Sequence, residues 1–275
     1  MTADRLVRLP GRDGRRAPSH AQMPALTCVA LALLVLSLLW GMVESRALPG
    51  GDPVWLKPAK FALSFALTFG TLALVQARLS AGWAQSLTLR VTEGVMTAAF
   101  SLEMIYLTYQ AACGEASHFN FSDAFHIQMY QFMGVGAVLL MLGIGVFGIV
   151  VLRDRDVRLS PSLRLAIGVG FLLTLVLTLL TAGVLGANGG HLVGTPPPDA
   201  TNWPLLGWSG TVGDLRPAHF LALHAMQALP LYVLWRERTA GPLSRRHIAL
   251  AALGWTALTL LVFVQALSGR PIFPL

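Results

Sequence analysis

Seven apolar stretches, each about 20 residues long, restrict what this chain can fold into more than any other feature. A helix needs about 20 predominantly apolar residues to cross the hydrocarbon core of a bilayer. Hydrophobic residues make up 55% of the 275-residue chain and charged residues only 12%, which is unusual for a soluble domain. We therefore expect an all-α, polytopic membrane protein with a single bundle of seven transmembrane helices. The expected spans are residues 23–43, 58–77, 91–112, 124–152, 163–185, 217–235 and 248–267.

Basic residues predict how this bundle is oriented, because Lys and Arg resist translocation whereas Asp and Glu have little effect. Fifteen of the 20 basic residues precede the first span or lie in loops on the same side of the membrane, and five lie on the opposite side. The N-terminus is therefore expected in the cytoplasm and the C-terminus outside. Residues 1–22 would form a basic cytoplasmic leader, and residues 268–275 an outer C-terminal tail.

The formal net charge of +7 follows from this topology and does not indicate nucleic-acid binding. Most of the excess positive charge lies on the short loops that are expected in the cytoplasm. These basic residues are not interleaved with aromatic residues, and they belong to no recognised nucleic-acid-binding motif. The lipid bilayer is the partner that the charge pattern predicts.

Polar residues at membrane depth are informative, because each costs a few kcal/mol to insert and tends to face an interior cavity. In the third expected span, Glu103, Tyr106 and Gln110 are spaced i, i+3 and i+7 and share one helix face. Glu93 lies near the inner end of the same span. It is either a second protonatable group or the partner of Arg90, three residues earlier.

The histidines are distributed unevenly between the two sides of the membrane. Five of the seven are expected on the outer side: His118, His126, His191, His219 and His224. In an ordinary bundle these residues would line one outward-opening pocket that binds a small molecule, with Glu103 near its floor and the loop 186–215 as its roof. The other residues expected in this pocket are Tyr106, Gln110, Gln131, Gln227, Lys60 and Arg216.

Histidines on several spans suggest a cofactor, because neutral imidazole ligates both haem iron and divalent metals. The first hypothesis is a b-type haem, or a divalent metal ion, that serves membrane electron transfer. His126 and His224 are the leading ligand pair, and His118, His191 and His219 are further candidates. The competing explanation is structural: the histidines would only hydrogen bond to neighbouring side chains or backbone near the membrane interface.

Two alternative functions use the same residues differently. A proton-coupled small-molecule transporter would use Glu103 and Glu93 as protonatable relay groups, and Lys60 or Arg216 would neutralise an anionic substrate. A metal-dependent membrane hydrolase would use Glu103 as a catalytic base beside a metal ion. The ligands of that metal ion would be His118, His126 and His224.

Three polar segments near the outer ends of the spans carry a family resemblance. They are WLKPAKFALS at residues 55–64, ASHFNFS at residues 116–122 and GDLRPAHFLALHAMQALP at residues 213–230. Through these segments the chain resembles a family of uncharacterised bacterial multipass membrane proteins. The resemblance implies a bacterial cytoplasmic (inner) membrane, and it implies no activity.

Overall fold

The computed structural model describes residues 22–48, 51–204 and 206–275, and this part of the chain is mostly helical (71%). Seven long helices each overlap one of the stretches expected from the sequence. Residues 1–21 of the expected leader lie outside the described residues. The long helices are α1 (Gln22–Gly41), α2 (Leu56–Gln76), α4 (Leu87–Cys113), α5 (Ala124–Arg153), α6 (Pro161–Ala187), α7 (Arg216–Ala240) and α8 (Arg245–Leu267).

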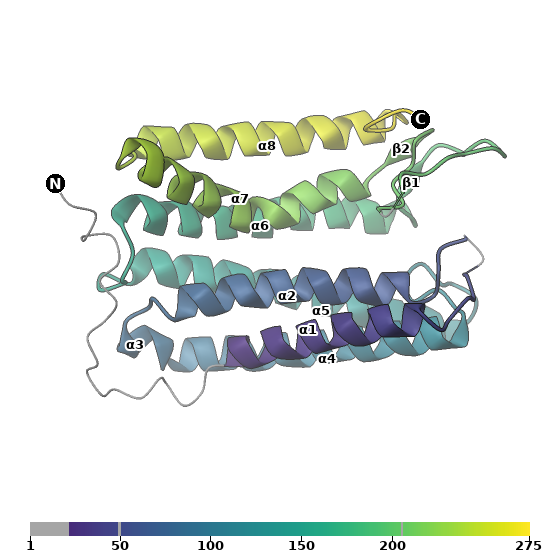
Figure 1. Cartoon of the computed structure of the whole chain (residues 1–275), viewed down its shortest axis with the longest axis horizontal. Helices are drawn as coiled ribbons and strands as arrows, with labels where there is room; N and C mark the ends of the chain where they lie inside the picture. Colours follow the sequence, from purple (N-terminus) through teal and green to yellow (C-terminus); the bar gives the residue numbers. More distant parts are fainter. Residues whose placement is uncertain (1–21, 49–50, 205) are drawn as a thin grey trace.

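The long helices lie side by side in a bundle, with α6 packed against both α5 and α7 (Figure 1). The helices α1, α4, α6 and α8 all finish at one end, which we call the long-loop end (Figure 1). The opposite end, where α2, α5 and α7 finish, is called the short-loop end. It carries the four-residue helix α3 (Ala81–Ala84). At the long-loop end, strands β1 (Leu192–Val193) and β2 (Gly213–Asp214) form an antiparallel pair.

Local side-chain chemistry fixes several helix ends. Ser86, Asp123 and Ser160 precede α4, α5 and α6, and the side chain of each accepts a hydrogen bond from a backbone N–H in the first turn. These bonds satisfy donors that the helix itself leaves unpaired. Gly114 ends α4 with a φ of 77°, a left-handed conformation that glycine adopts without steric cost.

Aromatic side chains form the core between α2 and α4. The rings of Phe65 and Phe69 are stacked with their centroids 5.7 Å apart. Phe100 meets both rings edge-on, at 4.9 and 5.1 Å. Such edge-to-face pairs add about 0.5–1.5 kcal/mol each beyond the area that they bury.

Polar contacts at the short-loop end join helices that are distant in the sequence. The guanidinium of Arg164 in α6 donates to the carbonyls of Val151 and Leu152, which end α5. The carboxylate of Glu237 in α7 accepts hydrogen bonds from the hydroxyls of Ser160 and Ser162. These bonds satisfy helix-terminal groups and hold α5, α6 and α7 together.

Glu93 is buried between α2 and α4, where its carboxylate accepts a hydrogen bond from the side-chain amide of Gln76. The structure therefore assigns Glu93 a partner on a neighbouring helix. The sequence offered only Arg90 on the same helix, since the pairing with Gln76 depends on how α2 packs against α4.

Five helices in the described part of the chain are long and apolar enough to cross a membrane: α1, α2, α5, α6 and α8. The chain is thus a mostly helical, multi-pass membrane protein. The two remaining long helices, α4 and α7, carry the polar residues that define the candidate site.

Replacement of Gly170 in α6 tests how closely α6 and α7 approach each other. A Cβ at Gly170 would lie 2.9 Å from the carbonyl oxygen of Ala225 in α7, so Gly170→Ala must separate the helices. We expect a loss of about 1–3 kcal/mol of stability, measured as a lower melting temperature in detergent. The matched control is Gly134→Ala in α5, where an added Cβ meets nothing within 4 Å. Equal melting temperatures for the two variants would contradict the close approach.

Candidate functional site

Three protonatable side chains from separate segments contact one another at the long-loop end. Lys57 lies in the first turn of α2, His118 in the loop between α4 and α5, and Glu103 within α4. The Nζ atom of Lys57 is 3.2 Å from Nδ1 of His118. The Nε2 atom of His118 is 3.3 Å from Oε1 of Glu103. We call these residues the polar triad.

The triad connects the end of the bundle with its interior. Glu103 lies ten residues before the end of α4, which corresponds to about 15 Å along the helix axis. Its side chain is only 6% exposed. The loop after Gly114 turns back into the bundle, so that the imidazole of His118 reaches the carboxylate of Glu103.

The hydrogen-bonding capacities of the three groups determine how protons are arranged among them. A lysine ammonium can only donate, so it donates to Nδ1 of His118. In the neutral imidazole Nε2 then carries the hydrogen and donates to Glu103. The hydroxyl of Ser117 also lies 3.1 Å from Nδ1. His118 thus lies between Lys57 and Glu103, and its imidazole can exchange a proton with either side chain.

Aromatic rings enclose the imidazole of His118. The ring centroids of Phe61 in α2 and Tyr130 in α5 lie 5.6 and 6.2 Å from the imidazole centroid. Burial in this environment lowers the pKa of His118 below its ordinary value, and the positive charge of Lys57 lowers it further. The hydrogen bond to Glu103 opposes this shift in the pKa only in part.

A second group of charged residues surrounds the backbone of Gly207 in the long loop after α6. A Cβ built at Gly207 would lie within 4 Å of Nζ of Lys60, the carboxylate of Asp52 and the guanidinium of Arg216. Lys60 donates to the carbonyl of Leu206 at 3.1 Å, and Arg216 donates to the carbonyl of Gly207 at 2.5 Å. These two cations hold the long loop against the starts of α2 and α7.

Arg216 is also paired with a buried carboxylate. Its Nη2 atom lies 2.6 Å from Oδ2 of Asp214, whose side chain is fully buried. The backbone N–H of Ser209 donates to the same carboxylate at 2.9 Å. Lys60 and Arg216, which the sequence predicted in a substrate pocket, therefore both have structural partners in this loop.

His191 lies just before β1, beside the same charged group. Its carbonyl accepts a hydrogen bond from the backbone N–H of Leu215, 2.9 Å away. Burial lowers the pKa of its imidazole, and the nearby charge of Arg216 lowers it further. His191 thus lies near Arg216 in the structure, and its role in a ligand pocket stays a prediction.

His126 lies at the start of α5, among acidic residues of the long-loop end. Its Nδ1 atom is 2.8 Å from Oδ2 of Asp123, and its Nε2 atom is 3.0 Å from Oε2 of Glu115. Hydrogen bonds from the backbone N–H and the imidazole of His126 lower the pKa of Asp123. Both imidazole nitrogens thus have protein partners.

The two histidines of α7 have different partners. Nδ1 of His224 is 3.2 Å from Oε1 of Gln227, and the ring of His224 lies 4.3 Å from that of Phe220. Gln227 in turn donates to the hydroxyl of Thr71 in α2 at 3.1 Å. His219 instead contacts α6, with its Nδ1 atom 3.2 Å from the hydroxyl of Thr181. The leading haem-ligand pair, His126 and His224, therefore shares no partner, and their joint ligation of a haem stays a prediction.

The expected polar face of α4 is buried, as its spacing predicted. Glu103, Tyr106 and Gln110 are all buried. Gln110 donates to Glu115 at 3.4 Å, and the hydroxyl of Tyr106 has no hydrogen-bond partner within the described residues. Gln131, by contrast, lies on an exposed face of α5.

A surface hollow of about 510 Å³ lies at the long-loop end, between the loop after α1 and the loop after α4. Asp52, Glu115, Phe119 and Asn120 are among its lining residues. Ala116 also lines it, and this residue and Phe119 flank Ser117 and His118 in the sequence. Phe119 adopts a φ of 56°, which is rare for a bulky residue and costs about 1–3 kcal/mol. The hollow offers carboxylate, amide and aromatic groups to a small molecule.

Asp52 and Glu115 were not expected in the site. Lys57 is recognisable in the sequence, beside Lys60, as a basic residue at the outer end of a span, but its pairing with His118 depends on the fold of the intervening helices. The segment ASHFNFS contained the available signal, since polar and aromatic residues alternate there between two spans.

The described residues contain no group of three or more His, Cys, Asp and Glu side chains arranged to hold a metal ion. The three ligands proposed for a hydrolase metal, His118, His126 and His224, accordingly do not form such a group. No family model, no curated protein and no solved structure matches this chain. The site must therefore be interpreted from its own geometry.

The burial of His118 predicts that the stability of the protein depends on pH. Burial favours neutral His118 in the folded protein, whereas in the unfolded chain its pKa is about 6.5. The unfolded chain therefore binds more protons below about pH 6.5, and stability falls as the pH decreases through that value. We expect the melting temperature in detergent to fall by a few degrees between pH 7.5 and 5.5, and to fall less in His118→Gln. Identical slopes for both proteins would count against a buried, neutral His118.

Removal of the Arg216 guanidinium tests how the long loop is held. Arg216→Gln leaves the buried carboxylate of Asp214 without its ion-pair partner, which is a costly change. We expect faster hydrogen–deuterium exchange in residues 206–215, by about tenfold or more. The matched control is Arg270→Gln, an exposed arginine at the same end of the bundle. Unchanged exchange in Arg216→Gln would show that other contacts hold the loop.

Proposed function

We propose that the chain is a seven-span protein of a bacterial inner membrane with its N-terminus in the cytoplasm. The two helices that complete seven spans, α4 and α7, contain 27 and 25 residues, so they are about 40 and 38 Å long. Either length suffices to cross a bilayer. The distribution of the basic residues supports the orientation, since 15 of 20 lie on the side expected in the cytoplasm.

The two faces of α4 support its assignment as a span. Its buried residues include Glu93, Glu103 and Gln110, whereas its exposed large residues are mainly apolar, among them Val91 and Ile105. The remaining buried residues of α4 are mostly apolar, among them Phe100 and Leu107. A helix in water would expose a polar face, whereas the exposed face of α4 is apolar, as expected when lipid surrounds it, and its buried polar residues would face the bundle interior.

We further propose that the polar triad is the proton-binding part of a proton-coupled small-molecule transporter. The observation that carries this proposal is the continuous contact from Lys57 through His118 to the buried carboxylate of Glu103. An ionisable residue inside a membrane bundle is expensive and usually functional, and chains of Asp, Glu and His form proton relays in transporters. The hollow lined by Ala116 and Phe119, which flank His118 in the sequence, would admit the substrate.

The other hypotheses have less support from the geometry. Haem ligation needs two imidazoles that face one iron, whereas His126 and His224 contact separate sets of residues. An absorption spectrum of the purified protein tests it: a Soret band that is lost in His126→Ala or His224→Ala would favour haem over transport.

Proton movement across proteoliposomes tests the transporter proposal. Vesicles that contain a pH-sensitive dye are given an inward proton gradient and exposed in turn to amines, amino acids and carboxylates. We expect at least one of these classes to increase proton entry in the wild type. Glu103→Gln should abolish this increase, because an amide cannot bind the transported proton.

The matched control is Glu44→Gln. Glu44 is a partly buried carboxylate at the same end of the bundle, paired with Arg46 at 2.7 Å, and this pairing lowers its pKa to about 2. This variant should retain proton movement. Equal proton entry in Glu103→Gln and the wild type, or no response to any class of compound, would contradict the proposal.

A further inference from the structure

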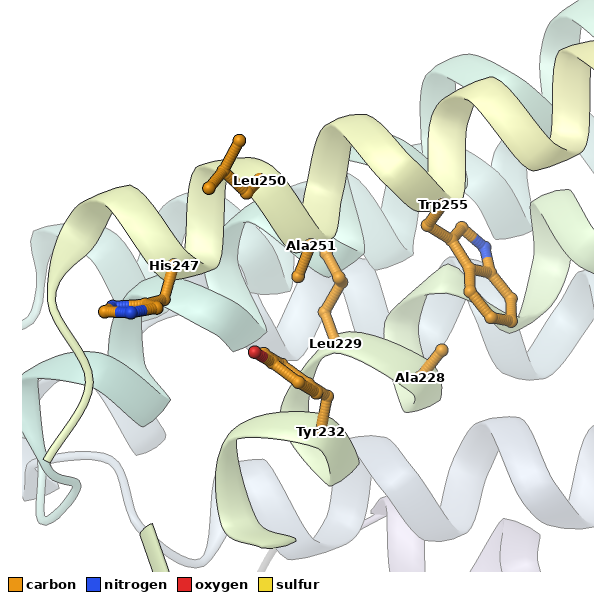
Figure 2. A pocket seen from close by; sticks show the side chains of 7 residues that line it. All are labelled: Ala228, Leu229, Tyr232, His247, Leu250, Ala251 and Trp255. Carbon is orange, nitrogen blue, oxygen red and sulfur yellow. The ribbon is translucent and has the colours of Figure 1, made fainter. Parts of the chain in front are cut away.

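A groove with a volume of about 430 Å³ lies between α7 and α8 (Figure 2). Its lining residues Tyr232 and His247 are close in sequence to the loop that joins these helices at the short-loop end. Tyr232 and Leu229 line the groove from α7, and His247, Ala251 and Trp255 line it from α8. Neither the triad nor the hollow at the long-loop end shares a residue with this groove.

The groove is polar at one end and apolar at the other. Figure 2 shows the hydroxyl of Tyr232 on the side of His247, with Trp255 at the opposite end of the groove. His247 is the third residue of α8, and Trp255 follows eight residues later, about 12 Å deeper along the helix. The indole N–H of Trp255 donates to the carbonyl of Leu221 at 2.9 Å, so this end presents an apolar ring.

Four arginines lie on the helix turns that border the polar end. Arg245 and Arg246 begin α8, and Arg236 and Arg238 lie in the last two turns of α7. Glu237 is the one acidic residue among them in the sequence, and hydrogen bonds from the hydroxyls of Ser160 and Ser162 hold its carboxylate against the start of α6. Four positive charges and one negative charge therefore lie on these two helix ends, and the net charge beside the polar end of the groove is positive.

The imidazole of His247 is positioned by a neighbouring residue. Its Nδ1 atom lies 2.8 Å from the hydroxyl of Ser244, which directs Nε2 away from that hydroxyl. An anion at this end of the groove could therefore be met by His247 and by the arginines that precede it.

We propose that this groove binds one anionic phospholipid. The phosphate would lie between His247 and the Arg245–Arg246 pair, and one acyl chain would follow Leu229 and Ala251 toward Trp255. Basic pockets between transmembrane helices on the cytoplasmic side bind anionic lipid head groups. The charge favours this occupant over a second copy of the chain, since a copy would have to bring its own arginines against these. The proposal does not depend on proton transport.

Native mass spectrometry of the full-length protein in detergent tests this site. The protein is mixed with equal amounts of phosphatidylglycerol and phosphatidylcholine, which differ in net head-group charge. We expect one phosphatidylglycerol to remain bound in preference to phosphatidylcholine. Arg245→Ala/Arg246→Ala should weaken this preference by about 25-fold, because each arginine near an anionic membrane surface contributes about fivefold.

Two further variants separate a defined site from diffuse surface charge. Arg153→Ala/Arg155→Ala removes an exposed arginine pair at the end of α5, at the same end of the bundle, and should leave the preference unchanged. Ala251→Trp should fill the groove and reduce binding of both lipids. Melting temperatures confirm that each variant is folded. Equal binding of the two lipids by the wild type, or an equal loss in the two arginine-pair variants, would overturn the proposal.

Discussion

The buried carboxylate of Glu103 is the constraint on which the long-loop end depends. An ionised carboxylate inside a helix bundle is costly unless it is paired and hydrogen bonded. His118 supplies the hydrogen bond at 3.3 Å and Lys57 supplies the nearby positive charge. For His118 and Lys57 to reach Glu103, the loop after α4 must turn back into the bundle, and α2 must begin beside that loop. The path of this loop thus follows from the need to satisfy one charge.

The bundle has two chemically different ends. The long-loop end carries the polar triad and the charged residues around Gly207, which hold its loops in place. The short-loop end carries most of the arginines, and its contacts mainly satisfy helix ends, as Arg164 does for α5. A protein that exchanges protons and small molecules with the outside, and contacts anionic lipid on the inside, would have this asymmetry.

The helices could be predicted from the sequence because membrane insertion leaves a strong local signal. Each expected span overlaps a long helix, and the i, i+3, i+7 spacing correctly predicted that Glu103, Tyr106 and Gln110 are buried together. Contacts between distant segments could not be predicted in the same way. The partners of Glu93, Lys57 and Lys60 lie on other helices or in loops, and no periodicity in the chain encodes those pairings.

Cysteine labelling in intact cells tests most directly whether the triad faces the outside. Cys113 is the last residue of α4, is exposed, and lies next to the loop that contains His118. A membrane-impermeant maleimide should label Cys113 without permeabilisation, and Cys113→Ser should remove that signal. Labelling of Cys113 only after the cells are permeabilised would place the triad on the cytoplasmic side and contradict the proposed orientation and function.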